Sequence, residues 1–254
     1  MSRALREFWG GWVAAVRTLS LLPMPGPHAA RFANALPWFP AAGMLLGAIP
    51  YGLVCLAERV AGPRAPAPVL AFVVLALGAI LTRGLHLDGL ADWADGIGAG
   101  RDRERALAIM KDPHTGAFGA IALGLDLVGR FAALVVLLGA GRGVWIVAAA
   151  TISRTAQVGW AAFLPYARAD GTAAAFVRGA RVWHFAAALA LGAGLLFAMG
   201  GAPALALLAG GLSVAAAFGF HARRRFGGIT GDLLGAGNEW VEVVLLLASA
   251  ALFI

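Results

Sequence analysis

Long runs of apolar side chains recur along this chain of 254 residues and constrain its fold more than any other feature. Hydrophobic residues make up 61% of the sequence and charged residues only 13%, and the mean hydropathy is +0.81. A water-soluble protein of this composition would expose large apolar surfaces. Runs of about 20 apolar residues are long enough to cross a bilayer as helices. The sequence therefore predicts a polytopic integral membrane protein of the all-α class.

We expect about seven transmembrane helices in a single domain that covers residues 1–254. Residues 4–22 are less apolar and are predicted to form an amphipathic helix that lies on the membrane surface. Gly43 and Gly47 form a GxxxG pair, which allows two helices to approach closely. A Gly-Gly-Ala-Pro turn at residues 200–203 joins the fifth and sixth spans. The seven predicted spans are residues 36–57, 67–85, 117–139, 143–163, 184–200, 203–220 and 238 to the C-terminus.

The basic residues gather on one side of this predicted topology. The formal net charge is +7, and most arginines lie in the N-terminal segment and in the connections 86–113, 164–183 and 221–237. Because positively charged connections tend to remain in the cytoplasm, we expect these four regions to be cytoplasmic and the C-terminus to lie outside. The same rule accounts for the basic character better than nucleic-acid binding does. We therefore predict membrane lipid, and no nucleic acid, as a partner.

The segment from Gly84 to Gly96, GLHLDGLADWADG, is the most unusual part of the chain. It places Asp88, Asp92 and Asp95 at positions i, i+4 and i+7, which lie on one face of a helix. Like charges at this spacing repel each other and destabilise a helix. A cation among them would offset the repulsion, and Mg²⁺ binds carboxylates while keeping water and substrate phosphates as further ligands. The segment predicts a magnesium site, with a solvated polar loop as the alternative.

A second unusual segment, GGITGDLLGAGNEWVE, covers residues 227–242. Its glycines allow the backbone to approach a ligand, and successive N–H groups in such turns bind phosphate. Glu239 and Glu242 stand at the head of the last predicted span, where helix capping explains them as well as function does. Since this segment and the acidic one face the same compartment, we expect them to form a two-part site. The candidate site residues here are Gly228, Thr230, Gly231 and Asp232.

Several single residues are further candidates. Arg154 lies within the fourth span and needs either a partner or a substrate phosphate there. His86 could be a metal ligand, a general base or a hydrogen-bonding group, and the sequence leaves these open. Lys111 begins a KDPHTG segment that we expect to close near the site, and Asp126 and Arg130 are expected to pair at i,i+4. Carboxylate-bound Mg²⁺, arginines and glycine turns together indicate phosphoryl chemistry.

These motifs resemble the cobalamin synthase family, the adenosylcobinamide-GDP ribazoletransferases of cobamide biosynthesis. The resemblance covers essentially the whole chain and is carried by both segments above, by GRDRERALAIMKDPHTGAFG and by SRTAQVGWAAFLPYAR. It implies a Mg²⁺-dependent transferase of the bacterial inner membrane whose active site faces the cytoplasm. The implied reaction joins adenosylcobinamide-GDP to α-ribazole, or its 5′-phosphate, with release of GMP. That reaction is the last assembly step of adenosylcobalamin.

The resemblance also implies roles for the candidate residues. His86 would be the base for the attacking ribose hydroxyl, while Lys111 and Arg154 would contact phosphate. One metal ion and two are equally compatible with this many carboxylates. The implied magnesium ligands are Asp88, Asp92, Asp95 and Asp232. The implied catalytic residues are His86, Asp92, Lys111 and Arg154.

A cation-coupled membrane transporter is the alternative function. Its acidic cluster would bind the translocated ion, and such sites lie near the bilayer midplane on broken helices. Here the densest charge falls in a connection at one membrane face, which favours the transferase.

Overall fold

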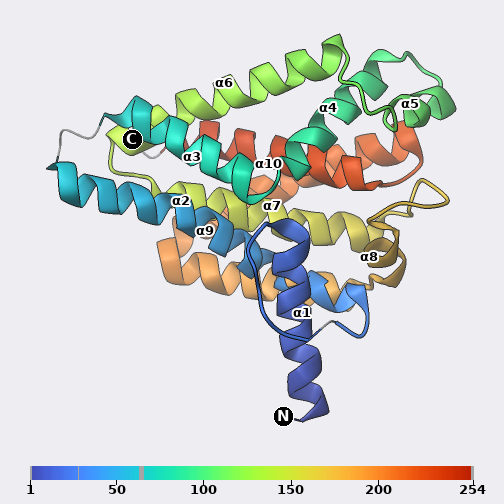
Figure 1. Cartoon of the computed structure of the whole chain (residues 1–254), viewed down its shortest axis with the longest axis horizontal. Coiled ribbons are helices and arrows are strands. Elements are labelled where there is room, and N and C mark those ends of the chain that lie inside the picture. Colours follow the sequence, from blue (N-terminus) through green and yellow to red (C-terminus); the bar gives the residue numbers. More distant parts are fainter. Residues whose placement is uncertain (1, 28, 63–65, 253–254) are drawn as a thin grey trace.

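The structure, a computed structural model, describes residues 2–27, 29–62 and 66–252, so the single domain predicted for residues 1–254 extends beyond the described residues. Within those ranges all assigned elements are helices and none is a strand, which confirms the all-α class. Figure 1 shows long helices running side by side between two ends of the molecule, with α1 projecting steeply from them. The elements are α1 (Arg3–Leu19), η1 (Phe32–Trp38), α2 (Phe39–Ala61), α3 (Ala67–Leu81), α4 (Leu85–Gly98), α5 (Arg103–Ile109), α6 (Ala117–Gly139), α7 (Val144–Phe163), α8 (Ala174–Gly179), α9 (Val182–Phe226) and α10 (Gly231–Leu252).

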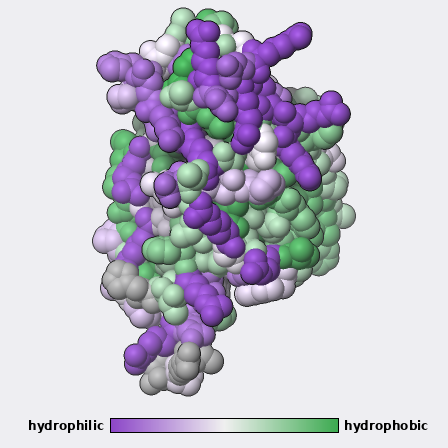
Figure 2. Space-filling model, turned by 90° about the vertical axis from the view of Figure 1, so that its right-hand side faces the viewer, coloured by the Kyte–Doolittle hydropathy of each residue, from purple (hydrophilic) through white to green (hydrophobic). Residues whose placement is uncertain are grey.

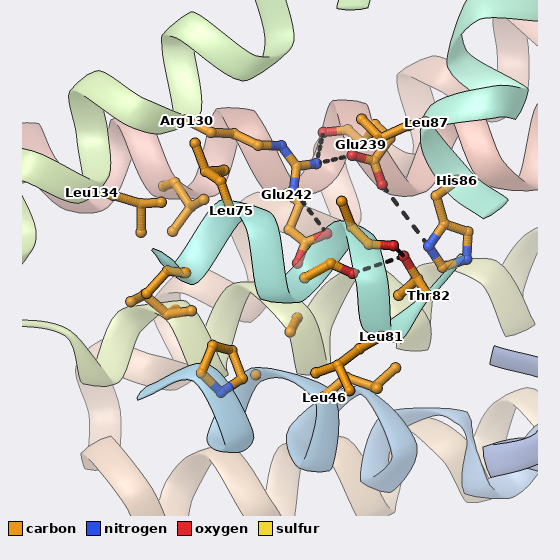
Figure 3. A pocket seen from close by; sticks show the side chains of 18 of the residues that line it. Leu46, Leu75, Leu81, Thr82, His86, Leu87, Arg130, Leu134, Glu239 and Glu242 are labelled. Atoms are coloured by element: carbon orange, nitrogen blue, oxygen red, sulfur yellow. Dashed lines mark hydrogen bonds and ion pairs between the residues drawn. The ribbon is translucent and has the colours of Figure 1, made fainter. Parts of the chain in front are cut away.

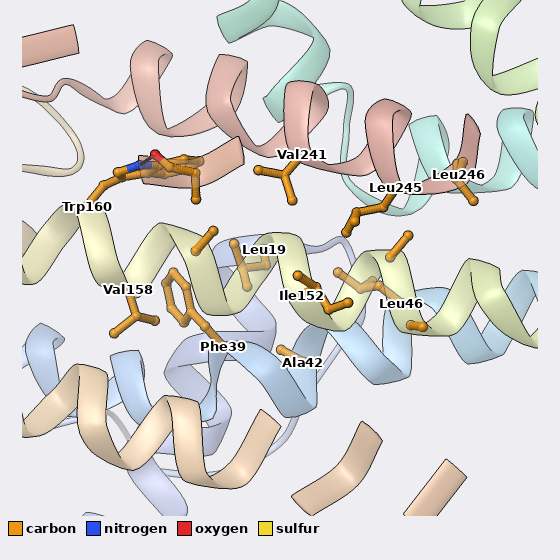
Figure 4. Packing of buried hydrophobic residues seen from close by; sticks show 14 of the residues in the cluster. Leu19, Phe39, Ala42, Leu46, Ile152, Val158, Trp160, Val241, Leu245 and Leu246 are labelled. Carbon is orange, nitrogen blue, oxygen red and sulfur yellow. Dashed lines mark hydrogen bonds between the residues drawn. The ribbon is translucent and has the colours of Figure 1, made fainter. Parts of the chain in front are cut away.

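Helix α7 forms the centre of the bundle and is buried along most of its length. Figure 4 shows Ile152 and Trp160 of α7 between Phe39 of α2 and Val241 and Leu245 of α10. All five side chains belong to one apolar core. The Trp160 indole N–H is satisfied there by the carbonyl oxygen of a residue in α9, at 2.8 Å. The core therefore joins the central helix to its neighbours on several sides.

The predicted GxxxG contact is confirmed between α2 and α7. A Cβ atom on Gly43 would lie 2.3 Å from the Ala150 carbonyl oxygen, and one on Gly47 would lie 2.8 Å from the Val147 Cα. Both distances are shorter than atoms tolerate, so only glycine allows the two backbones to approach this closely.

Helix α1 has the predicted amphipathic character. Val13, Val16 and Leu19 are buried against the bundle, whereas Leu5 and Phe8 are more than half exposed. Ser2 caps the helix by accepting a hydrogen bond from the Leu5 backbone N–H. Its position on the membrane surface stays a prediction.

The predicted number of seven spans is not confirmed. Among the described residues four helices are long and apolar enough to cross a membrane, or up to five if α3 and α4, bent by 87°, form one broken span. Helix α7 is not one of the four, since it carries Ser153, Arg154 and Gln157. These polar side chains are buried in the protein, so they lower the helix's hydropathy without facing lipid.

Helix α9 contains the predicted turn. Gly201 has φ 60° and ψ −144°, which no α-helix adopts, so the helical assignment runs across a break. Phe185 lies beside Gly159 of α7, and Trp160 of α7 lies beside Gly219. Residues 185 and 219 therefore lie near adjacent positions of α7, so the two halves of α9 fold back on each other.

The segments predicted as loops at 86–113 and 221–237 are largely helical, which corrects that part of the prediction. Helix α4 covers the acidic motif, α5 follows it, and only residues 227–230 separate α9 from α10. The polar composition suggested a loop, but Leu90 and Ala94 of α4 repeat at helical spacing and are buried.

The charged connections gather at one end of the bundle. In Figure 2 that end faces the viewer, and hydrophilic side chains cover its upper part and run down its middle between apolar flanks. Two arginines close this end reciprocally. Arg103 donates from Nε to the Phe226 carbonyl oxygen at 2.7 Å, at the end of α9. Arg225 of α9 donates to the carbonyl oxygens of Gly100 and Arg101, which follow α4.

Replacing Gly43 by alanine tests the contact between α2 and α7. The Gly43→Ala protein should be less stable than wild type by about 1–3 kcal/mol, because the new methyl group forces the helices apart. Thermal unfolding in detergent micelles measures this change.

Gly52→Ala is the matched control on the same helix, since a Cβ there meets nothing within 4 Å. It should be neutral or stabilising by up to about 1 kcal/mol, from helix propensity alone. Equal effects of the two substitutions would show that the close approach is unimportant.

Candidate active site

Helices α4 and α10 meet at glycines, so the two segments predicted to share a site lie side by side. A Cβ atom on Gly89 would lie 2.5 Å from the Asp232 carbonyl oxygen. One helical turn away, a Cβ on Gly235 would lie 3.2 Å from the Cα of His86. The acidic motif and the second segment thus touch through their backbones, and the aspartates of α4 lie next to the start of α10.

Asp92 stands at the centre of this acidic cluster. It is partly buried, and the charges acting on its carboxylate are those of Asp232, Asp88 and Asp95, opposed only by Arg168. Three negative neighbours and one positive neighbour leave an excess of negative charge. A cation bound beside Asp92 would relieve this repulsion.

Asp95 differs from the other aspartates because it caps a helix. Its Oδ2 accepts the backbone N–H of Gly116 at 2.7 Å, and its Oδ1 accepts that of Gly119 at 2.9 Å. Both groups belong to the first turn of α6, whose dipole favours a negative charge there. The sequence predicted the same metal-binding role for all three aspartates, whereas in the structure Asp95 caps α6.

The cluster suits magnesium better than a metal that needs many protein ligands. Among the described residues no three His, Cys, Asp or Glu side chains form a ready metal site. Magnesium needs only one or two carboxylates, with water and substrate phosphates completing its shell. Asp88, Asp92 and Asp232 supply hard oxygen atoms, so this donor set fits Mg²⁺.

Arg168 lies at the acidic cluster, although no sequence pattern marked it as a candidate. Its Nη1 donates to Asp232 Oδ2 at 2.6 Å, and its Nη2 donates to the Leu107 carbonyl oxygen at 3.3 Å. The segment before it is fixed by a parallel bridge between Tyr166 and Ile229. The contact joins residues 64 positions apart, so no local pattern could have indicated it.

Most of the glycine turn before α10 packs against other parts of the protein, which leaves little room for a ligand. A Cβ on Gly228 would lie 2.1 Å from the Pro165 carbonyl oxygen, and the Ile229 N–H donates to that same oxygen at 2.9 Å. Thr230 is fully buried and its hydroxyl accepts the N–H of a residue in the first turn of α10, as an N-cap does. Of the candidates here, Gly231 and Asp232 line an open cavity.

His86 and Arg154 lie in a buried polar network rather than among the aspartates. Arg154 Nη2 lies 3.3 Å from His86 Nδ1, and Arg154 Nη1 donates to Glu242 Oε1 at 3.0 Å. Gln157 Nε2 lies 3.1 Å from His86 Nε2. Arg154 is only 3% exposed, so its guanidinium is already paired within the bundle.

Arg130 holds the other half of this network, which Figure 3 shows around a cavity of about 80 Å³. Its Nε pairs with Asp126 at 2.8 Å, which confirms the predicted i,i+4 pair. It also pairs with Glu239 and with Glu242, the latter at 3.4 Å. Three carboxylates therefore meet two guanidiniums where α6, α7 and α10 converge.

The structure thus separates the predicted site residues into groups. Asp88, Asp92 and Asp232 lie together, and His86 lies between them and the buried network. Lys111 is exposed on the connection between α5 and α6. Beside it, the backbone and ring of His114 hydrogen-bond to Asp112 and lower the pKa of that carboxyl.

Arg154→Ala tests the role of the buried network. Removing the guanidinium leaves Glu242 with one cation fewer, so we expect a loss of about 3–5 kcal/mol in stability. The exposed Arg101 is the control, and Arg101→Ala should leave the thermal unfolding temperature unchanged. An Arg154→Ala protein that folds normally but cannot bind substrate would restore Arg154 as a phosphate contact.

Asp95→Ala tests helix capping. Losing both accepted N–H groups should cost about 0.5–2 kcal/mol, and Asp95→Asn, which keeps one acceptor oxygen, should cost less. Chemical denaturation in mild detergent measures both. An Asp95→Asn protein of wild-type stability but without activity would mean that Asp95 acts as a ligand instead.

Comparison with known proteins shows which family this chain belongs to. Residues 11–250 match the family model described as Cobalamin-5-phosphate synthase. A protein of Chlorobium phaeobacteroides (strain BS1) named adenosylcobinamide-GDP ribazoletransferase is 44% identical over 95% of this chain and 98% of its own length. One of the same name from Chlorobaculum tepidum is 47% identical over 94% of each chain.

A third relative, from Syntrophobacter fumaroxidans, carries that name and is 41% identical over 96% of this chain and 98% of its own length. No solved structure matches. The family match covers nearly the whole chain and includes both segments of the site. The chain therefore belongs to the cobalamin-5-phosphate synthase family and is a transferase of cobalamin assembly.

Proposed function

We propose that this protein joins adenosylcobinamide-GDP to α-ribazole or its 5′-phosphate and releases GMP, in a Mg²⁺-dependent reaction. The names of the relatives support the substrates. The observation that carries the site is the close contact at Gly89, which brings Asp88 and Asp92 of α4 beside Asp232 of α10. A carboxylate cluster with excess negative charge is suited to a metal that meets a phosphoanhydride.

The reaction exchanges one phosphorus–oxygen bond for another. A ribose hydroxyl oxygen attacks the phosphorus next to the cobinamide, and the bond from that phosphorus to GMP breaks. GMP leaves with the bonding electron pair, and the hydroxyl gives up its proton. Catalysis of such a transfer depends on positioning and on offsetting charge.

Asp88, Asp92 and Asp232 would hold the magnesium ion, which when bound supplies Lewis-acid polarisation of the phosphate oxygens. Arg168 stands 2.6 Å from Asp232 and is the guanidinium of this cluster. Once a metal satisfies Asp232, Arg168 is free to donate to a phosphate oxygen. It therefore takes the phosphate-binding role that the sequence assigned to Arg154.

The geometry favours a hydrogen-bonding role for His86 over that of a base. A guanidinium can only donate, so Nδ1 of His86 must accept from Arg154. Its Nε2 faces the Gln157 amide nitrogen, which is also a donor. Both ring nitrogens are therefore engaged within the protein, and neither is free to take a substrate proton. Asp88 is exposed and lines the same cavity as His86, so its carboxylate is the better placed proton acceptor.

The charged end of the bundle would face the cytoplasm of the bacterial inner membrane. Hydrophilic side chains gather at this end, Arg103 and Arg225 among the residues that close it, as the positive-inside rule requires of cytoplasmic segments. The site and the topology signal thus lie at the same end.

Asp92→Asn is the direct test of the proposal. The substitution removes the carboxylate at the centre of the cluster while keeping its shape. Because a bound metal offsets several kcal/mol of charge, turnover should fall by more than about 100-fold. GMP and cobamide formation are measured with both substrates and Mg²⁺ in detergent.

Asp170→Asn is the control, because Asp170 is an exposed carboxylate in the connection after α7. It should keep wild-type activity. Mg²⁺ should also raise the unfolding temperature of wild type and Asp170→Asn, but not of Asp92→Asn. Near-normal turnover of Asp92→Asn would remove Asp92 from the metal site, and a wild-type protein that makes no product would refute the proposed reaction.

A further inference from the structure

A second, larger cavity opens beside the acidic cluster. Its volume is about 500 Å³, and it lies between two sets of helices. Helices α1, α2 and α8 and the turn η1 form one wall, while α4, α7 and α10 form the other. Asp88 and Asp232 both line it, so any molecule bound there reaches the carboxylates of the proposed reaction.

The first wall is apolar and partly aromatic. It presents Leu19 of α1, Leu36 of η1, Phe39 of α2 and Phe176 of α8. The Phe39 and Phe176 rings lie 6.1 Å apart at an interplanar angle of 56°. Flat heteroaromatic rings bind well to such surfaces, since stacking on an aromatic side chain is tolerant of ring type.

The opposite wall is polar and contains an amide that the protein leaves incompletely bonded. Gln157 is only 4% exposed, and its amide contacts His86 and the Leu234 carbonyl oxygen through one atom only. Because the Leu234 carbonyl oxygen can only accept, the amide nitrogen faces it, and the amide oxygen Oε1 has no partner in the protein. An unsatisfied buried group beside a cavity is suited to a ligand hydroxyl.

The rim of the cavity carries a basic residue in an unusual conformation. Arg83 is exposed and has φ 57°, in the left-handed region that side chains other than glycine rarely adopt. It lies in the short link between α3 and α4. A cation at the rim is well placed to meet a single phosphate on a ligand whose body lies inside.

We infer that this cavity binds the nucleoside acceptor, with its flat base against the Phe39–Phe176 wall and its ribose toward Gln157 and Asp88. The inference rests on the proposed function. Pockets of roughly 300–1,000 Å³ hold ligands of drug size, so a nucleoside fits whereas a corrin ring with its side chains does not. Away from the proposed metal, Arg83 is the only arginine or lysine among the described residues that line the cavity, which favours a neutral nucleoside or one with a single phosphate at the rim.

Binding of α-ribazole alone to the full-length protein in detergent tests this inference. Phe176→Ala should weaken α-ribazole binding, measured by calorimetry, by about tenfold, because it removes the stacking surface. It should raise the KM for α-ribazole by a similar factor and leave the KM for adenosylcobinamide-GDP unchanged. Phe163→Ala is the control, since Phe163 is exposed and pairs with Phe185 outside this cavity.

A second variant guards against misfolding. Thr172 lies on an exposed connection and lines the cavity, so Thr172→Trp fills the space without disturbing the core. It should abolish α-ribazole binding while keeping the wild-type unfolding temperature.

The outcomes separate this inference from the proposed function. If both variants bind α-ribazole normally, or if they change only the KM for adenosylcobinamide-GDP, the acceptor does not bind here although the enzyme still works. If wild type makes no cobamide yet binds α-ribazole in this cavity, the proposed reaction fails and the binding site stands.

Discussion

The pairing of buried charges determines how the helices of this protein fit together. Arg130 and Arg154 contact carboxylates on α6 and α10 in the largely buried interior of the bundle. Charges in such surroundings are costly unless they are paired. The helices can therefore settle only where guanidiniums and carboxylates meet, which fixes α10 against α6 and α7.

This fixed arrangement extends to the acidic cluster. Asp232 precedes Glu239 by seven residues on α10, so both lie on one face of the helix, two turns apart. On α4, His86 contacts the network while Asp88 and Asp92 reach toward the charged end. Helices α4 and α10 each carry residues of the acidic cluster and residues of the buried network. The pairing of charges in the network therefore sets the distance between the aspartates of α4 and Asp232 of α10.

Local patterns in the sequence predicted much of the fold. Apolar runs indicated helices, and the GxxxG pair at Gly43 and Gly47 indicated a close contact. The less apolar composition of residues 4–22 indicated an amphipathic helix. The number of spans could not be predicted in this way. The prediction counted residues 143–163 as a span, whereas α7 is not among the four sufficiently apolar helices of the described residues. It carries Arg154 and Gln157, whose partners Glu242 and His86 lie far away in the sequence.

The candidate site was predictable where its signal was local. The i, i+4, i+7 aspartates indicated the cluster, but the spacing could not reveal that Asp95 caps a helix whose N-cap residue lies 21 residues later. Arg168 and Arg154 were equally ambiguous, since each is one arginine among many. Only the fold shows that Arg154 forms an ion pair with Glu242, whereas Arg168 forms one with Asp232.

Arg103 and Arg225 belong to the basic end of the bundle and also help to hold its helices together. These arginines belong to the basic connections, and in the folded protein they donate to carbonyl oxygens where α9 and α4 end. Their charge is partly neutralised by those helix ends, so fewer cations remain to attract anionic lipid than the sequence suggests. The arginines that make this end of the molecule basic therefore also hold α9 against the segment that follows α4.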